Sequence, residues 1–488
     1  MMGKTNAFQG AFEALSQLGI PGRLSDLHDA GISIQRTILG GSHSVVTYPP
    51  LNSLQKLEPN DDIHPIYFGE STSLYIHIAF CETKCSFCHY AVRNYRGKSS
   101  SPPSRAEMVN DYLTALAAEI DDWSVQLNGE ETTINSIYIG GGTPLILETG
   151  QLISLLEHVQ QKFSVLPNAE ICVEGSPLTI TAVDGPTKLK ALKAHGVTRL
   201  SFGGQSFDDE VLRRAARGYK QDVLVQACET VSRYFDNWNL DLIQSLYKGN
   251  KDEVWHNLQM LEKLRPPHIT WYHGRFASRP QGAWLNDAQK SIDFETEEET
   301  LFGRMLLWQQ LTEMGYSQVD GNRFVQSEQY IDPFKKIRTS VSNNLLGLGA
   351  SAYSHVDMRP YPRWFTVPEG VFFRNVTDIG EYMRRMQTGQ DAVGSALALN
   401  YNEYLAAAHA TSLRTGILLS EVGEFSSTNQ AKHYRNLRSK LLSLGLLERF
   451  RDGSKNGIRL STLGQLYEDE VLSSFYSPTV QELLIRAA

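Results

Sequence analysis

The chain has 488 residues, a formal net charge of −8 at pH 7 and an apolar share of 41%. This length predicts two or three domains, the apolar share excludes general disorder, and the acidic balance argues against a nucleic-acid-coating surface, which would be basic. No run reaches the roughly 18 apolar residues of a membrane helix, and no signal-peptide core follows Lys4. We therefore expect a cytoplasmic protein with neither a membrane nor a nucleic acid among its partners.

An N-terminal extension, residues 1–70, precedes a predicted strand at residues 74–78. Three cysteines with the spacing C-x3-C-x2-C follow this strand: Cys81, Cys85 and Cys88. Three thiolates on one loop can hold three irons of a [4Fe–4S] cluster. No fourth cysteine follows, because the next residues are His89 and Tyr90, so one iron would stay open to a non-protein ligand. The alternative is a zinc site with His89 as the fourth ligand, since structural zinc is held by four such groups.

Short β-rich runs alternate with helical patterns as far as residue 272. Strands are predicted at residues 74–78, 136–139, 169–174, 198–202, 238–243 and 268–272. Helices are predicted at residues 105–126, 149–163, 186–195, 208–217, 220–234 and 251–264. Strands that alternate with helices form parallel βαβ units, so this order predicts an α/β fold with a partial (β/α)6 barrel. Binding groups in such barrels gather at the C-terminal strand ends.

A glycine-rich turn follows the second of these strands. It consists of Gly140, Gly141, Gly142, Thr143 and Pro144. Glycines allow positive φ and close backbone approach, and exposed N–H groups there can receive a ligand carboxylate or amino acid head group. Alone the motif is a weak signal, because glycine-rich turns are common between strands and helices.

Further candidate residues stand at the ends of successive predicted strands: Glu174, Gln205, Asp241 and Ile243. Gln205 offers both a donor and an acceptor. Arg217 lies on the helix predicted after Gln205, which can bring its guanidinium back over the site to pair with a carboxylate. Each position alone is equally consistent with a solvated strand end, and their joint placement favours a ligand site.

The remaining chain changes character after the barrel. The predicted core, residues 71–355, is followed by a connecting segment at 356–400 and a mainly helical C-terminal domain at 401–488. The order helix, helix, charged hairpin-like turn and final helix is typical of a winged helix. Because the chain is acidic, we expect this domain to be a lid or cap and not a DNA reader.

In this order, the motifs resemble those of the HemN-like family of radical S-adenosylmethionine (SAM) proteins, which takes its name from oxygen-independent coproporphyrinogen III oxidase. The resemblance covers about residues 70–480 and includes the string RLSFGGQSF at 199–207 and GLGAS at 347–351. It implies a radical SAM barrel, a [4Fe–4S] cluster and a 5′-deoxyadenosyl radical. It matches the GGGTP turn to the site that grips the SAM amino group and places Phe87 beside the cluster. By position it assigns contacts with the first SAM to Tyr75, Glu174, Gln205, Arg217 and Asp241.

Departures from the family pattern indicate the subgroup. Coproporphyrinogen oxidases carry a further cysteine where this chain has Tyr90, and the usual His-Ile-Pro-Phe has Ala79 in place of proline. The heme-chaperone branch carries an HNxxYW signature that is missing at residues 341–345. By elimination, the chain resembles the methylases and cyclopropanases of the family, which bind two SAM molecules. Oxidative decarboxylation of coproporphyrinogen and heme carriage on the same scaffold are the alternatives.

The resemblance also implies a mechanism. A 5′-deoxyadenosyl radical made from the first SAM would abstract hydrogen from the methyl group of a second SAM. The resulting methylene radical would add to an unsaturated carbon of a small-molecule substrate. A reductase, flavodoxin or ferredoxin would supply the electron. Tyr272 and His273, at the end of the last predicted strand, are the candidate catalytic residues, although a solvent-facing strand end is an equal alternative. An arginine- and aromatic-rich stretch at 359–374 is either an anionic-substrate site or a solvated loop.

Overall fold

The computed structural model describes residues 3–34, 45, 47–57, 71–88, 90–94, 104–127, 132–244, 246, 251–273, 295–334, 344–356, 370–422 and 428–487. Most of the arginine- and aromatic-rich stretch lies outside the described residues. His89 and residues 341–343, where the HNxxYW signature of the heme chaperones would begin, also lie outside them.

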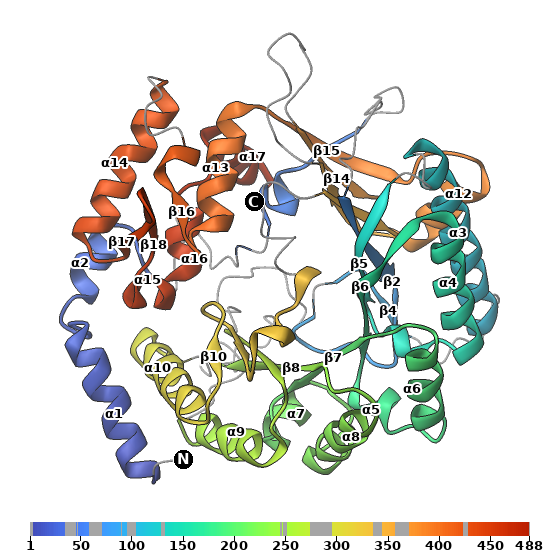
Figure 1. The fold of residues 1–488 in the computed structure, drawn as a ribbon, viewed down its shortest axis with the longest axis horizontal. Coiled ribbons are helices and arrows are strands. Elements are labelled where there is room, and N and C mark those ends of the chain that lie inside the picture. The colour runs from blue at the N-terminus through green and yellow to red at the C-terminus, as the bar shows by residue number, and fades with distance from the viewer. Residues whose placement is uncertain are drawn as a thin grey trace.

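One curved sheet organises the chain (Figure 1). Six of its strands run parallel in chain order: β2 (Ser71–Ile78), β5 (Thr133–Gly141), β6 (Ser164–Gly175), β7 (Arg199–Gln205), β8 (Trp238–Gln244) and β9 (His268–His273). The helices that connect them lie on the outer face of the curve: α3 (Arg105–Gln126), α4 (Thr149–Lys162), α6 (Gly185–Ala194), α8 (Gln221–Tyr234) and α9 (Lys251–Leu264). The predicted partial (β/α)6 barrel of an α/β protein is confirmed.

The sheet continues beyond the six strands on both sides. On one side follow β12 (Asn344–Leu348), β13 (Tyr353–His355), β14 (Gly370–Asn375), β15 (Val393–Leu399) and β1 (Gln55–Lys56). On the other side follow β11 (Arg323–Val325) and β10 (Ser317–Gln318). The predicted connecting segment, 356–400, therefore contributes two strands to the same sheet, and α12 (Ile379–Gln387) lies between them in the chain. The predicted domain boundaries stay a prediction.

Local sequence explains why these elements form. Ser104 caps the start of α3: its hydroxyl accepts from the backbone N–H of Glu107, while the Glu107 carboxylate accepts from the N–H of Ser104. This reciprocal cap satisfies two N–H groups at the helix start. α4 buries leucines and a valine three or four residues apart against the sheet: Leu152, Leu155, Leu156 and Val159. All but one residue of β8 are buried, because helices cover one face of the strand and the inside of the curve covers the other.

The inward face of the sheet carries polar side chains at β7 and β8. A Cβ atom at Gly204 would lie 2.8 Å from Leu240 of β8 and 2.9 Å from Leu224 of α8, so Leu240 faces the outer helices. Side chains alternate along a strand, so Asn239 and Asp241 face inward. Asn239 Nδ2 donates to the hydroxyl of Ser201 at 2.9 Å and to Oδ1 of Asp241 at 2.8 Å. Hydrogen bonds of this kind offset the free-energy cost of burying these polar groups.

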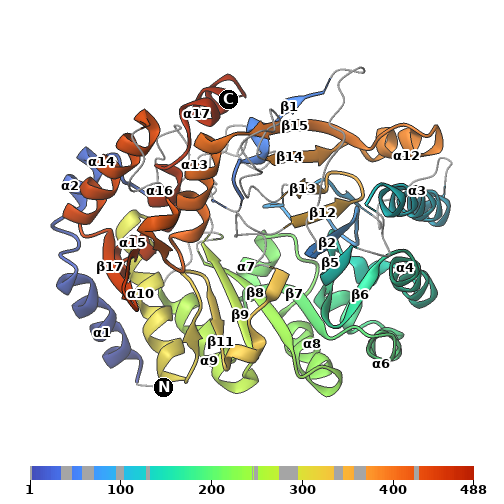
Figure 2. The same ribbon diagram turned by 45° about the horizontal axis from the view of Figure 1, so that its top comes forward.

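The N-terminal extension and the C-terminal region span the open side of the curve (Figures 1 and 2). α1 (Lys4–Gln17) packs on α10 (Glu297–Glu313) near one edge of the sheet, and β1 pairs with β15 at the other. The C-terminal region carries α13 (Tyr401–Ser412), β16 (Ile417–Leu418), α14 (Asn429–Ser443), β17 (Leu447–Asp452) and β18 (Lys455–Leu460). Its three strands form a separate sheet whose last two make a hairpin. This is the expected winged-helix-like arrangement.

Within the described residues, no helix is both long enough and apolar enough to cross a membrane.

Candidate functional site

The three loop cysteines, Cys81, Cys85 and Cys88, follow β2 at its C-terminal end. The first lies in β3 (Phe80–Cys81), which pairs with β4 (Arg93–Asn94). The turn between the other two is closed by a hydrogen bond from the N–H of Cys88 to the carbonyl of Cys85 at 3.2 Å. No group of three or more His, Cys, Asp or Glu side chains within the described parts of the chain already surrounds a single metal position.

The protonation of the thiols depends on a compensating charge. Burial raises the pKa of Cys81 to about 12, although a hydrogen bond with Thr143 opposes the shift, and burial also raises the pKa of Cys88. Without a cation both thiols are therefore neutral at physiological pH. Iron would supply the positive charge that stabilises thiolates. These residues fit a cluster: three thiols share one short loop, and all are free and only partly buried.

The cysteine loop is held by residues that follow β6 and by residues in the turn after the β7 unit. Glu82 is buried and its Oε1 accepts from the hydroxyl of Ser176, just beyond β6, at 2.9 Å. The N–H of Ser86 donates to the carbonyl of Ala215 at 3.2 Å. Arg217 Nη1 donates to Sγ of Cys85 at 2.9 Å. The loop is thus positioned by residues of two βα units far along the chain.

The glycine turn lies beside this loop and has no room for side chains. Gly141 has φ of 101°, and a Cβ atom there would lie 2.3 Å from Nδ1 of His77. A Cβ atom at Gly142 would lie 2.3 Å from the carbonyl of Phe80, and one at Gly140 would lie 2.8 Å from Glu174 Oε2. Glycine avoids the close approach at all three positions and, at Gly141, the left-handed strain as well.

The N–H groups of the turn already have protein partners. Gly141 N–H donates to Glu174 at 3.1 Å, Gly142 N–H to the carbonyl of Ile78 at 2.9 Å, and Thr143 N–H to the carbonyl of Phe80 at 2.7 Å. Of the two ligand groups expected here, a carboxylate and an amino acid head group, the carboxylate would find these three donors already occupied. The acceptors that remain are carbonyl and carboxylate oxygens, which suit an amino group.

Glu174 joins the glycine turn to the inward face of the sheet. Its Oε1 accepts from the hydroxyl of Tyr138 at 2.5 Å, and its Oε2 accepts from Gly141. Tyr75 pairs with Tyr138 across β2 and β5, their rings stack, and its hydroxyl lies 3.0 Å from Nδ1 of His77. The structure thus brings Tyr75, Glu174 and the glycine turn together.

A second group forms at the end of β7. Gln205 has φ of 69°, a strained conformation for a residue other than glycine. Its Oε1 is buried and accepts no hydrogen bond from the part of the chain that the structure describes. A Cβ atom at Gly203 would lie 2.2 Å from Nε2 of Gln205 and 3.5 Å from Nη2 of Arg217, so these two side chains are neighbours. Asp241 lies on the adjacent strand opposite Gly203.

The remaining predicted site residues lie along this same edge. Phe87 packs against a small apolar cluster that includes Ile243, so the cysteine loop lies near the end of β8. Tyr272 and His273 pair with Ile243 and Gln244 at the end of β9. Tyr272 is exposed and His273 is half-buried. The strands β5 to β8 separate β9 from β2 in the sheet, so a catalytic role for these two residues stays a prediction.

Helix α7 (Asp209–Arg214) ends three residues before Arg217. The helix predicted at 208–217 is thus too long, because Ala216 and Gly218 have φ of 54° and 74°, left-handed values that end a helix. Arg217 therefore stands in a turn, where Nε donates to the hydroxyl of Tyr219 at 3.0 Å and Nη2 donates to the carbonyl of Gly203.

A buried carboxylate, Glu119, lies behind the site and was not predicted from the sequence. Glu119 of α3 accepts from the N–H of Gly349 at 2.7 Å, the hydroxyl of Tyr382 at 2.6 Å and Nδ2 of Asn375 at 2.6 Å. On the same helix, the hydroxyl of Tyr112 donates to the carbonyl of His77 at 2.6 Å. These residues fix Gly349, just after β12, and the end of β2. The only sequence signal was an acidic residue on the apolar face of a predicted helix.

Tyr138 and Tyr219 were also missed, although both support predicted residues. Tyr138 lies two residues before Gly140 on the inward face of β5, so strand alternation could have placed it under the glycine turn. Nothing in the local sequence pairs Tyr219 with Arg217.

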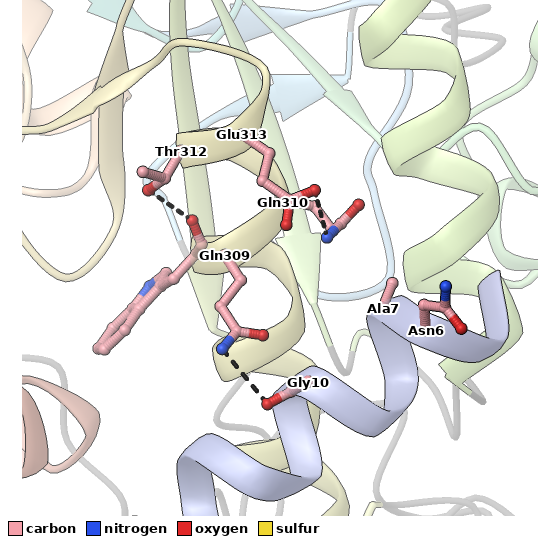
Figure 3. Close-up of a pocket in the computed structure, with 8 residues that line it drawn as sticks. Asn6, Ala7, Gly10, Gln309, Gln310, Thr312 and Glu313 are labelled. Atoms are coloured by element: carbon pink, nitrogen blue, oxygen red, sulfur yellow. Dashed lines mark hydrogen bonds between the residues drawn. The ribbon is translucent and has the colours of Figure 1, made fainter. Parts of the chain in front are cut away.

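A cavity of about 330 Å³ lies elsewhere, between α1 and α10 (Figure 3). Gln309 Nε2 donates to the carbonyl of Gly10 at 3.3 Å across its wall. None of the predicted site residues lines this cavity, so it takes no part in the site described above.

Comparisons with known proteins agree with this geometry. Residues 75–261 match the model of the radical SAM superfamily. The chain is 28% identical to heme chaperone HemW of Escherichia coli over 313 residues, 62% of this chain and 72% of that protein. It is 27% identical to HemW of Buchnera aphidicola over 58% of this chain and 70% of that protein. It is 28% identical to an oxygen-independent coproporphyrinogen III oxidase of Synechocystis over 63% of this chain and 66% of that protein.

The solved structure of coproporphyrinogen III oxidase (HemN) of Escherichia coli is similar in fold. The TM-score is 0.71 at 20% sequence identity, and the match covers 88% of this chain and 96% of that one. The relatives give no support to the assignment to the methylase and cyclopropanase subgroup, which was inferred from the sequence by elimination. They favour its two alternatives, the oxidase and the heme carrier.

Proposed function

We propose that the chain is a radical SAM enzyme of the HemN/HemW family, which holds a [4Fe–4S] cluster on its three loop cysteines and cleaves SAM reductively; the superfamily match and the HemW and coproporphyrinogen oxidase relatives support this proposal. The observation that carries this proposal is the linked arrangement at the ends of β2, β5 and β6. There the cysteine loop, the glycine turn and Glu174 are joined by backbone and carboxylate hydrogen bonds. A site preassembled in this way needs little reorganisation on binding.

When bound together, the cluster and SAM supply the electron transfer that breaks a sulfur–carbon bond and releases a 5′-deoxyadenosyl radical. The chain provides binding, orientation and shielding. The carbonyl groups of the glycine turn and the carboxylate of Glu174 offer acceptors to the SAM amino group and ribose hydroxyls. Gln205 offers its buried Oε1 as a further acceptor, which would gain a partner that the described residues do not provide.

The inward face of the sheet would hold the substrate. Its polar groups, such as Asn239 and Asp241, lie at the level of the candidate SAM site. The C-terminal region and the N-terminal extension span the open side of the sheet, which would limit the access of water to a reactive radical. Tyr272 and His273 would face this substrate, and a flavodoxin, ferredoxin or reductase would supply the electron.

Among finer reactions, we favour oxidation of the substrate by hydrogen abstraction, of the coproporphyrinogen oxidase type, over methyl transfer. One curated relative carries the first activity in its name, and the two-SAM hypothesis rested on elimination alone. A heme-binding carrier is the second candidate, because two HemW proteins match the chain over 70% and 72% of their own length.

Anaerobic incubation of the reconstituted protein with SAM and a reductant tests the proposal. We expect 5′-deoxyadenosine from the wild type and none from a variant with alanine at the three loop cysteines. A protein loaded with four irons that never cleaves SAM would contradict the proposal. Release of CO2 from coproporphyrinogen III would identify the oxidase type. Tight heme binding without 5′-deoxyadenosine would identify the carrier, and S-adenosylhomocysteine formed beside 5′-deoxyadenosine would restore the methylase hypothesis.

A further inference from the structure

Arg217 stands between the cysteine loop and the end of β7, and its guanidinium is held from three sides. Nε donates to Tyr219 at 3.0 Å, Nη2 donates to the carbonyl of Gly203, and Nη1 donates to Sγ of Cys85 at 2.9 Å. The ring of Tyr219 also lies 5.3 Å from the guanidinium carbon. These contacts fix a permanently charged group against a sulfur that the proposed function makes an iron ligand.

The number of donors shows that this contact is compatible with SAM binding. A guanidinium has five N–H groups, and the three hydrogen bonds above use three of them. Two N–H groups, one on each terminal nitrogen, remain for a carboxylate. The role expected from the sequence, pairing with SAM, therefore does not remove the bond to Cys85.

We propose that Arg217 sets the reduction potential of the cluster through its N–H···S hydrogen bond and positive charge at Cys85. This inference rests on the proposed function, because it requires a cluster on the loop cysteines. Reduction adds negative charge that is shared between iron and sulfur. A fixed cation and a hydrogen bond at a cluster sulfur stabilise the reduced form more than the oxidised form, and so raise the potential.

Other charges near the loop do not take over this role. Glu82 is directed to the hydroxyl of Ser176 at 2.9 Å, and Lys84 is exposed, so solvent screens its charge. Among the described residues, no other cationic side chain donates a hydrogen bond to a loop cysteine. The reduction potential of the cluster should therefore change when residue 217 is replaced.

Redox titration of the reconstituted protein without SAM, followed by the spectrum of the reduced cluster, measures this effect separately from catalysis. Arg217→Met removes both the charge and the donors, and Arg217→Gln removes the charge but keeps an amide donor. The matched control is Arg213→Met, because Arg213 is an exposed arginine on α7 that pairs only with Glu210 among the described residues. We expect Met at 217 to lower the ratio of reduced to oxidised cluster about tenfold at a fixed potential, equivalent to about 59 mV for one electron.

We expect Gln at 217 to lower the potential less than Met, and the control to match the wild type. A Met or Gln variant with full iron content and the wild-type potential would overturn the inference. If Met destabilises the cluster, the Gln variant decides. Loss of iron from both variants, with unchanged circular dichroism, would also overturn it and make Arg217 a scaffold residue. A wild-type protein that takes up no four-iron cluster would instead refute the proposed function.

Discussion

Replacing Glu119 with glutamine should change how the stability of the protein depends on pH. Burial raises the pKa of Glu119 to about 7 from its ordinary 4.5, against hydrogen bonds from Tyr382, Gly349 and Asn375 that lower it. The nearby Asp391 raises it further. The folded state thus binds this proton more tightly than the unfolded state does. The carboxyl contributes stability that is complete below pH 4.5 and is lost as the pH rises through 7.

The size of the effect follows from the two pKa values. Their difference, 7 − 4.5 = 2.5, corresponds to about 3 kcal/mol at 1.36 kcal/mol per unit. Glutamine does not ionise, so this slope disappears in the variant. Its amide nitrogen cannot accept a hydrogen bond, so at least one of the three buried donors loses its acceptor, at a cost of about 1–3 kcal/mol at every pH. We expect the variant to be less stable near pH 5, and this deficit to shrink by about 2–3 kcal/mol by pH 8.

Urea unfolding of the apoprotein, followed by tryptophan fluorescence at pH 5, 6, 7 and 8, measures this difference. Asp111→Asn is the matched control, because Asp111 is an exposed carboxylate on the same helix. Glu253, whose pKa burial also raises to about 7, titrates in both proteins and cancels from the comparison. A difference between wild type and variant that stays constant with pH would refute the reasoning, because Glu119 would then be ionised throughout.

Three further predictions concern the candidate site. Alanine at all three loop cysteines should abolish both the iron content and the broad absorbance near about 400 nm expected of iron–thiolate charge transfer. Cys172→Ala, at a fully buried thiol, should leave both unchanged. Iron retained by the triple variant would refute the cluster assignment. Gly141→Ala should lower SAM affinity at least about tenfold, because the Cβ atom of the new alanine would lie 2.3 Å from His77 in a backbone conformation with φ of 101°. Wild-type affinity in equilibrium dialysis would show that the turn does not contact SAM. Gln205→Leu, which keeps the approximate volume, should weaken SAM binding by about 1–3 kcal/mol through loss of a buried acceptor, and calorimetry that finds no change would remove Gln205 from the SAM site.

The amino-acid sequence by itself determined the alternation of strands and helices in the barrel. Helix α9 (Lys251–Leu264) lies at the predicted residues, and β5 and β8 contain the predicted strands. These elements follow from apolar spacing within single segments, which local sequence encodes directly. The cysteine spacing and the glycine turn are local patterns of the same kind, so both candidate cofactor positions could be recognised from the sequence alone.

Only the tertiary structure decided which distant groups meet. Arg217 reaches Cys85 across 132 positions, and Glu119 reaches Gly349 across 230. The N–H groups of the glycine turn donate to the carboxylate of Glu174 and to the carbonyls of Ile78 and Phe80, so a ligand carboxylate, one of the two groups expected there, would find these donors occupied. Contacts of this kind depend on the register between strands and on where a helix ends, as at α7. Both are set by the packing of the whole sheet, and no periodicity within one segment specifies them.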